Sequence, residues 1–239
     1  KMRAAKGIPS TAAITPIQFC EKYCQYVDEG YTDVIHVPIN RSGSSTYNNA
    51  VMAQGMLREE RPEHHLNIHL LDPHTYSMVF GWYLCEMARK LQNGAELRHV
   101  ISEFETQMNK MEVILGPYSL KQMKKSGRIS AAAAVMGELM GIRPIITLID
   151  GKTRVESKVR GDDKVIPAMI DLCKKRTEGV EDFDYMIGHT SIPQTAELEK
   201  VCRKAFGKAP LTTFNLGGVV SANTGPDTLA LIYVGKARD

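Results

Sequence analysis

The sequence lacks the features that mark membrane, secreted or strongly charged proteins. No apolar run approaches the ~20 residues of a membrane span, and Lys1 to Gly7 contain nothing like the apolar run of a signal peptide. The charge balance is nearly even, with 30 basic and 27 acidic side chains and a net charge of +3. This surplus is too small to indicate a phosphate-binding stripe, so we expect no nucleic-acid partner and no stable membrane insertion.

Paired cysteine motifs are also missing. The five cysteines are odd in number, widely spread and without CxxC spacing: Cys20, Cys24, Cys85, Cys173 and Cys202. We interpret them as reduced, which favours a cytoplasmic location. Cys20 and Cys24 are four residues apart on an expected helix, where small apolar packing is favoured over a metal site.

The common catalytic motifs are absent as well. There is no Walker-type glycine-lysine loop, no GxGxxG after a strand, no HExxH and no GxSxG. His64, His65 and His69 could hold a metal, but a loop pair beside a strand residue is more often structural or solvated. The sequence therefore predicts no catalytic residue, no metal and no cofactor.

What is present is the composition of an ordinary globular protein, 43% hydrophobic and 24% charged over 239 residues. Apolar periodicity and turn residues predict helices over residues 17–29, 47–57, 76–91, 95–110, 127–141 and 167–176. They predict strands over residues 32–39, 66–71, 111–115, 144–149, 154–159, 185–189, 212–216 and 229–234.

This order predicts an α/β protein with two lobes. Strands and helices alternate in residues 1–116, as in an α/β/α lobe with a parallel sheet. Residues 117–239 add a hairpin around Asp150-Gly151, which favours a two-layer lobe with a mixed sheet. We place the boundary at Gly116-Pro117, where a regular element is expected to break.

Three polar, glycine-containing clusters are the candidate sites, at residues 42–46, 126–130 and 223–226. The first opens an expected helix, so it could bind an anion such as a carboxylate, or Ser44 or Ser45 could be an ordinary N-cap. In the second, Arg128 could bind a carboxylate or phosphate, or be solvated. The third, which contains Asn223 and Thr224, indicates a turn first of all.

Taken in order, these clusters and several other segments resemble the DegV family over nearly the whole chain. Residues 11–19 resemble its Thr-Ser-Gln-Pro-Ser-Pro segment, and Ser44, Ser45, Thr46 and Tyr47 align with its Ser-Gly-Thr-Tyr loop. The other matching segments are residues 120–129 (Tyr-Leu-Lys-Lys-Gly-Gly-Arg-Ile), 137–160, 188–189 (Gly-His) and 217–226 (the closing His-Thr-Gly-Pro-Gly segment).

The resemblance implies a two-lobed DegV-like protein that binds a long-chain fatty acid such as palmitate or oleate. By this analogy Thr11, Ser44 and Thr46 hold the carboxylate, and the acyl tail lies in a buried tunnel. It also implies a separate fatty acid kinase as partner, with Arg128, Asn223 and Thr224 near the phosphoryl-transfer step. The protein itself would be a carrier rather than an enzyme.

The sequence departs from the family pattern at several positions. Asn223 stands in place of a histidine, Asp227 in place of a glycine, and Pro73 in place of the serine of an Asp-Ser turn. Asparagine does not titrate near neutral pH, which puts delivery to a kinase in doubt more than binding. The family's opening strand does not precede the Thr11 segment, so we expect a truncation or a missing opening segment.

Two other classes of function stay open. A regulatory protein could sense a small amphiphile, and ligand-dependent partner binding would distinguish it from a carrier. A phosphotransferase related to the dihydroxyacetone kinase fold, or a hydrolase using Ser44, has less support, because neither a phosphate-binding lysine motif nor a base for Ser44 is evident.

Overall fold

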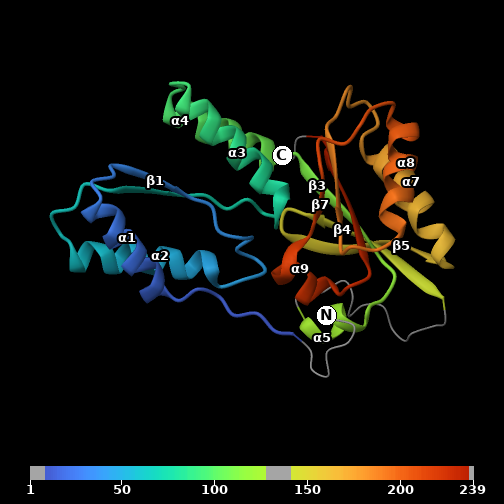
Figure 1. The fold of residues 1–239 in the computed structure, drawn as a ribbon, viewed down its shortest axis with the longest axis horizontal. Helices are drawn as coiled ribbons and strands as arrows, with labels where there is room; N and C mark the ends of the chain where they lie inside the picture. The colour runs from blue at the N-terminus through green and yellow to red at the C-terminus, as the bar shows by residue number, and fades with distance from the viewer. Residues whose placement is uncertain (1–8, 128–140, 237–239) are drawn as a thin grey trace. The chain divides into compact units, whose positions relative to one another are not determined.

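The computed structural model of the chain describes residues 9–127 and 141–236 (Figure 1). The described chain divides into two compact units. Residues Ala12–Tyr76 form the smaller unit, and the larger one starts at Ser77 and includes the residues up to Thr11. The lobe boundary between residues 116 and 117 stays a prediction. Gly116 and Pro117 themselves end a strand, β3, inside the larger unit.

The smaller unit begins with α1 (Pro16–Asp28), close to the predicted span. Thr15 starts the helix with a capping box: its Oγ1 accepts from the Gln18 backbone N–H at 3.3 Å, while Gln18 Oε1 accepts from the Thr15 N–H at 3.0 Å. Gly30 follows the helix with φ of 78°, a left-handed conformation that glycine adopts without strain. The expected glycine stop is therefore confirmed.

Two parallel strands form the sheet of this unit, β1 (Asp33–His36) and β2 (Asn67–Leu70), joined through α2 (Thr46–Glu60). Both strands are shorter than predicted. Pro38 lacks the N–H that a longer β1 would need to extend its ladder. The core of the unit is formed by buried side chains from α1, from α2 and from the residue just before β2, among them Phe19, Tyr23, Ala53, Leu57 and Leu66.

The larger unit is built on a six-stranded sheet with the order β5-β4-β3-β8-β6-β7. The strands are β3 (Met111–Pro117), β4 (Ile142–Ile149), β5 (Lys152–Arg160), β6 (Tyr185–His189), β7 (Thr213–Asn215) and β8 (Thr228–Val234). Only β6 and β7 pair in parallel, so the sheet is mixed, as predicted. The hairpin of β4 and β5 turns at Asp150-Gly151, both of which have positive φ.

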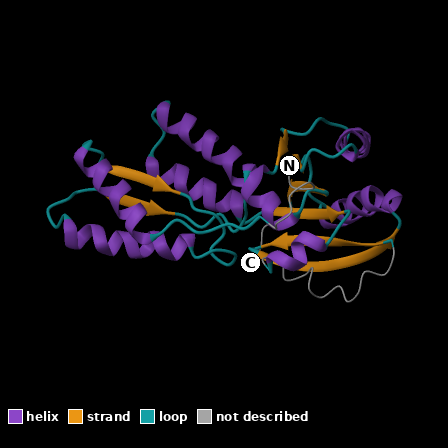
Figure 2. Cartoon of the chain, turned by 60° about the horizontal axis from the view of Figure 1, so that its bottom comes forward, coloured by secondary structure: helices purple, strands orange, loops and turns teal. Residues whose placement is uncertain are grey.

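Helices α7 (Val165–Arg176) and α8 (Gln194–Phe206) lie along this sheet (Figure 1). Their apolar faces and the sheet share one buried core that includes Ile114, Met169, Ile187, Leu198 and Leu231. Helices α3 (Met78–Gln92) and α4 (Leu97–Met108) form an adjacent pair, and η2 (Asp162–Lys164) precedes α7. The α/β class with a small parallel sheet and a larger mixed sheet is confirmed (Figure 2).

Three helices of the larger unit were not expected from the sequence. They are α5 (Lys121–Ser126), α8 and α9 (Gly217–Thr224). α5 is only six residues long, and α9 opens with two glycines and closes with Asn223 and Thr224, all poor helix formers. The two short helices α5 and α9 pack against each other, and this tertiary contact supports both. Most of the Ala-rich helix predicted over residues 127–141 lies outside the described residues.

A buried carboxylate links β3, α7 and β8. Glu112 is 5% exposed and accepts hydrogen bonds from Arg176 Nε, from Arg176 Nη2 at 3.0 Å and from the Tyr233 hydroxyl at 2.6 Å. The ion pair raises the pKa of Arg176, and burial followed by the bond to Glu112 raises the pKa of Tyr233. Both groups therefore keep their protons.

Replacing this carboxylate should destabilise the larger unit severely. Glu112→Ala leaves an arginine and a buried hydroxyl without their acceptor, so we expect the free energy of unfolding to fall by about 3–5 kcal/mol. Trp82 lies in α3 and is the single tryptophan, so its fluorescence during urea denaturation reports on this unit. Glu181→Ala, at an exposed position, is the control. Equal losses in the two variants would contradict the structural role of Glu112.

A half-buried histidine should make the smaller unit sensitive to acid. His36 Nδ1 lies 2.6 Å from the Tyr23 hydroxyl, its ring packs edge-on against Phe19, and burial lowers its pKa. Unfolding restores a pKa of about 6.5, so the unfolded chain takes up the proton first. Stability is therefore complete above that pH and falls as pH drops through the lowered folded pKa.

Hydrogen exchange of peptides from α1, corrected for intrinsic rates, should show this loss between neutral and mildly acidic pH. A His36→Gln variant should show a shallower pH dependence, since glutamine does not titrate. The same slope in both proteins would rule out His36 as the source of the acid sensitivity.

Candidate functional site

The polar loop after β1 packs against the loop after β2, because parallel strands bring their carboxyl ends to one edge of the sheet. Asn40, which is fully buried, joins the two loops. Its backbone N–H donates to the Thr75 carbonyl at 3.1 Å, and its Nδ2 donates to the Tyr76 hydroxyl at 3.0 Å. Its Oδ1 accepts from the Ser42 N–H at 3.0 Å, which holds the start of the polar cluster.

Gly43 is required by this packing. A Cβ atom at Gly43 would lie 1.8 Å from the hydroxyl oxygen of Tyr76, so a side chain there would displace the Tyr76 ring. Arg41 stands beside Gly43 and Asn40 with its guanidinium 5.1 Å from the centre of the Tyr47 ring. This cation–π contact keeps a positive charge next to the loop.

Ser44 and Thr46 form a hydroxyl pair at the start of α2. Their side-chain oxygens lie 2.7 Å apart, and Ser44 Oγ also accepts from the Thr46 backbone N–H at 3.2 Å. Ser45 is the N-cap residue of α2, but its side chain makes no capping hydrogen bond. The capping explanation is therefore wrong for Ser45, whereas Ser44 does accept from the first N–H of the helix. The paired hydroxyls sit at a helix N-terminus, where an anion is favoured.

The loop after β2 adds polar groups that the sequence did not single out as site residues. The carboxylate of Asp72 is 8% exposed, and its Oδ1 accepts from the His74 N–H at 3.0 Å. Its Oδ2 lies 3.6 Å from His74 Nδ1 and 4.0 Å from Arg41 Nε. Thr75 is 4% exposed, and its hydroxyl has no hydrogen-bond partner within the described residues. No pattern in the sequence marks Thr75; only the burial of its hydroxyl does.

Asn223 and Thr224 lie at the end of α9, against α5. Gln122 Nε2 donates to the Ala222 carbonyl, and Ser126 Oγ donates to the Asn223 carbonyl at 3.3 Å. The Asn223 side chain is half-buried and donates to the Val219 carbonyl at 2.9 Å, one turn earlier. Asn223 is therefore part of a helix end as well as of the turn that was expected.

Thr224 is buried, and its carbonyl accepts from the Thr228 hydroxyl at 3.0 Å. Its own hydroxyl oxygen lies 3.4 Å from the Gly225 carbonyl. These contacts make Thr224 a residue that shapes the turn into β8.

The remaining residues of the expected site are placed less completely. Arg128 lies outside the described residues, directly after the turn at Gly127 that ends α5. Thr11 is exposed and belongs to the larger unit, whereas Ser44 and Thr46 belong to the smaller one. Within single units, the structure brings Ser44 to Thr46, and it brings Asn223 and Thr224 to the α5 segment that precedes Arg128. A carboxylate site shared by Thr11 and Ser44 stays a prediction.

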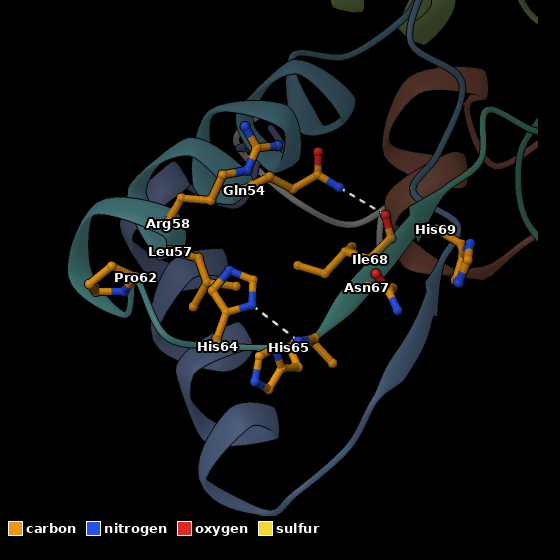
Figure 3. Close-up of a pocket in the computed structure, with 10 residues that line it drawn as sticks. Gln54, Leu57, Arg58, Pro62, His64, His65, Asn67, Ile68 and His69 are labelled. Atoms are coloured by element: carbon orange, nitrogen blue, oxygen red, sulfur yellow. Dashed lines mark hydrogen bonds between the residues drawn. The ribbon is translucent and has the colours of Figure 1, made fainter.

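A separate hollow of about 830 Å³ lies in the smaller unit between α2 and β2 (Figure 3). It is lined by Gln54, Leu57, Arg58, Pro62, His64, His65, Leu66, Asn67, Ile68 and His69. Two of its histidines make hydrogen bonds within the protein. His64 Nδ1 accepts from the Leu66 N–H at 3.1 Å, and His69 Nε2 lies 2.9 Å from Asp33 Oδ1. Neither Ser44 nor Thr46 lines this hollow.

None of the helices within residues 9–127 and 141–236 combines the length and apolar character that crossing a bilayer requires.

Comparison with solved structures reproduces the fold over nearly all of the chain. A stearic-acid-binding protein from Eubacterium ventriosum superposes with a TM-score of 0.86 at 20% identity, covering 99% of this chain and 81% of that one. A fatty-acid-binding DegV family protein from Streptococcus agalactiae superposes with a TM-score of 0.84 at 26% identity, covering 98% and 81%.

Sequence comparison agrees. A DegV domain-containing protein from Clostridium perfringens is 29% identical over 232 residues, which cover 95% of this chain and 78% of that protein. The family model described as "Uncharacterised protein, DegV family" matches residues 1–236. The chain belongs to the DegV family.

Proposed function

We propose that the protein binds a long-chain fatty acid such as palmitate or oleate. In this proposal Ser44, Thr46 and Thr11 hold the carboxylate, and the acyl tail lies in a buried tunnel. The observation that supports it most directly is the Ser44–Thr46 hydroxyl pair, 2.7 Å apart at the N-terminus of α2, in a chain of the DegV family. The relatives from Eubacterium ventriosum and Streptococcus agalactiae are fatty-acid-binding proteins.

The chemistry of the loop suits a carboxylate. Hydroxyls that now bond to each other can turn and donate to an incoming anion, and hydrogen bonds to charged groups are stronger than those between neutral ones. The guanidinium of Arg41, held over the Tyr47 ring, adds a favourable charge. The acyl tail supplies most of the affinity, about 0.8 kcal/mol for each buried CH₂.

The protein is, in this proposal, a cytoplasmic carrier without catalysis of its own, which presents the carboxylate to a separate fatty acid kinase. Arg128, Asn223 and Thr224 are the residues assigned to the phosphoryl-transfer step. The bonds of Gln122 and Ser126 to the end of α9 support this assignment, because they tie the segment before Arg128 to Asn223. An arginine there would offset the charge that grows as the phosphoryl group arrives.

The first test is extraction of the purified protein with organic solvent and identification of the released acids by mass spectrometry. Wild-type protein should carry one long-chain acid per chain. Ser44→Ala should weaken binding roughly 10- to 100-fold, as expected for one hydrogen bond to a charged group. Ser45→Ala is the matched control, because the side chain of Ser45 is exposed and makes no capping hydrogen bond. It should retain the lipid.

Two results would reject the proposal. One is the absence of lipid from the wild type together with no binding of added palmitate or oleate. The other is equal loss of lipid from the Ser44 and Ser45 variants, which would show that the hydroxyl of Ser44 is not a specific contact.

Asn223 sets the second test, on delivery of the acid to a kinase. Asparagine cannot exchange a proton near neutral pH, so we expect slow formation of acyl phosphate when the loaded protein meets a fatty acid kinase. Asn223→His should raise this rate at least about a hundredfold, the lower end of the contribution of general acid–base groups, without changing the amount of bound lipid. Acyl phosphate trapped as hydroxamate provides the measurement. An unchanged rate would mean that residue 223 plays no part in the transfer.

A further inference from the structure

Two cysteines and a glutamate meet between α1 and α2. Cys20 and Cys24 are one turn apart on α1, and Glu60 is the last residue of α2. The two thiol sulfurs and one carboxylate oxygen all lie within 4.8 Å of one another. Cys20 Sγ is 3.7 Å from Glu60 Oε2, with its S–H oriented to donate. Analysis of the sequence alone pairs the two cysteines but gives no sign of the third group, which is far away along the chain.

The spacing of these atoms suits a tetrahedral metal ion. Zinc binds thiolate sulfur at about 2.3 Å and carboxylate oxygen at about 2.0–2.2 Å, which puts neighbouring ligand atoms roughly 3.5–3.8 Å apart. The observed 3.7 Å between sulfur and oxygen is already in this range. Cys20 is 2% exposed and Cys24 is 7% exposed, whereas Glu60 is on the surface. An ion could therefore enter from the side of Glu60, where a water molecule would complete the coordination.

The charges nearby are also suitable. Two thiolates and one carboxylate carry three negative charges, which a divalent cation and the guanidinium of Arg61 would balance. A hydrogen bond with Cys24 is the main reason that the pKa of Arg61 is raised, ahead of its ion pair with Asp28 at 3.7 Å. The Arg61 guanidinium therefore places a positive charge beside the cluster.

A metal ion binds cysteine as the thiolate, so the thiol protons have to leave. Burial, followed by the neighbouring Cys24 and Glu60, raises the pKa of Cys20 to about 11. A metal ion must displace these protons, which pass to solvent as two thiols become thiolates.

We propose that Cys20, Cys24 and Glu60 form a binding site for a single thiophilic divalent cation of the zinc type. Soft thiolate ligands favour such an ion over magnesium or calcium, which prefer oxygen. The ion would link the first helix of the smaller unit to the end of the second. The site uses neither Ser44 nor Thr46, so it is independent of fatty-acid binding.

Cobalt(II) is the probe, added to the reduced, intact protein under anaerobic conditions. Thiolate ligation should produce a sulfur-to-cobalt charge-transfer band that saturates at one equivalent and disappears when zinc is added. This band requires sulfur, so ions bound only by the histidines of the hollow would not produce it. Cys24→Ala should abolish the band, and Cys85→Ala, at an exposed cysteine, should leave it unchanged.

The decisive variant is Glu60→Gln, since Glu60 is exposed and the change should not disturb folding. It should weaken cobalt binding at least about tenfold, as loss of a metal-site contact typically does. The matched control, Glu59→Gln, alters the exposed neighbour and should bind normally. No charge-transfer band in the wild type, or equal affinity in the two glutamine variants, would overturn the proposal and leave Cys20 and Cys24 as packing residues.

Discussion

The candidate carboxylate site depends on the parallel pairing of β1 with β2. Hydrogen bonds of Asn40 join the loops that follow these two strands. The pairing brings the loops after the two strands to the same edge of the sheet. Asn40 then links them through the Thr75 carbonyl and the Tyr76 hydroxyl. Because this asparagine is fully buried, loss of either bond would leave a polar group without a partner, a cost of about 1–3 kcal/mol. The position of Ser44 is therefore determined by contacts on both strands.

Much of the fold could be predicted from the sequence, because local signals agree with the final structure. Thr15 and Gly30 bracket α1 as capping rules require, and the turn Asp150-Gly151 marks the β4–β5 hairpin. One failure is a helix without local support, α9, which begins with Gly217-Gly218 and is stabilised by α5. The missed helix α8 is different, because it has Glu197 in its first turn and Gly207 as a left-handed C-cap, signals that a sequence does express. The predicted ranges for β1 and β2 were too long, because the residues flanking each strand resemble strand residues in composition but do not form its backbone hydrogen bonds.

The candidate site was predictable only in part. Ser44 and Thr46 were found through a motif, which preserves spacing along the chain. The unpartnered hydroxyl of Thr75 and the buried carboxylate of Asp72 were not, because their significance comes from burial, which a sequence does not express. Glu60 is a similar case. It lies 40 residues from Cys20 along the chain, and only the packing of α1 on α2 brings the two side chains to 3.7 Å.

In the proposed function, Asn223 would separate binding of the acid from its transfer to the kinase. Holding a carboxylate requires hydrogen-bond donors, and the hydroxyls of Ser44 and Thr46 supply them without any change in protonation. Phosphoryl transfer to that carboxylate adds charge, and a group that can gain or lose a proton responds to it where an amide cannot. The Asn223 amide is moreover already bonded to the Val219 carbonyl within its own helix. On this proposal the chain keeps the hydroxyls that would hold the acid, while the end of α9 presents a neutral amide donor that does not titrate. Sequence differences at that helix end would then alter the rate of transfer without changing the affinity for the acid, which the loops of the smaller unit would determine.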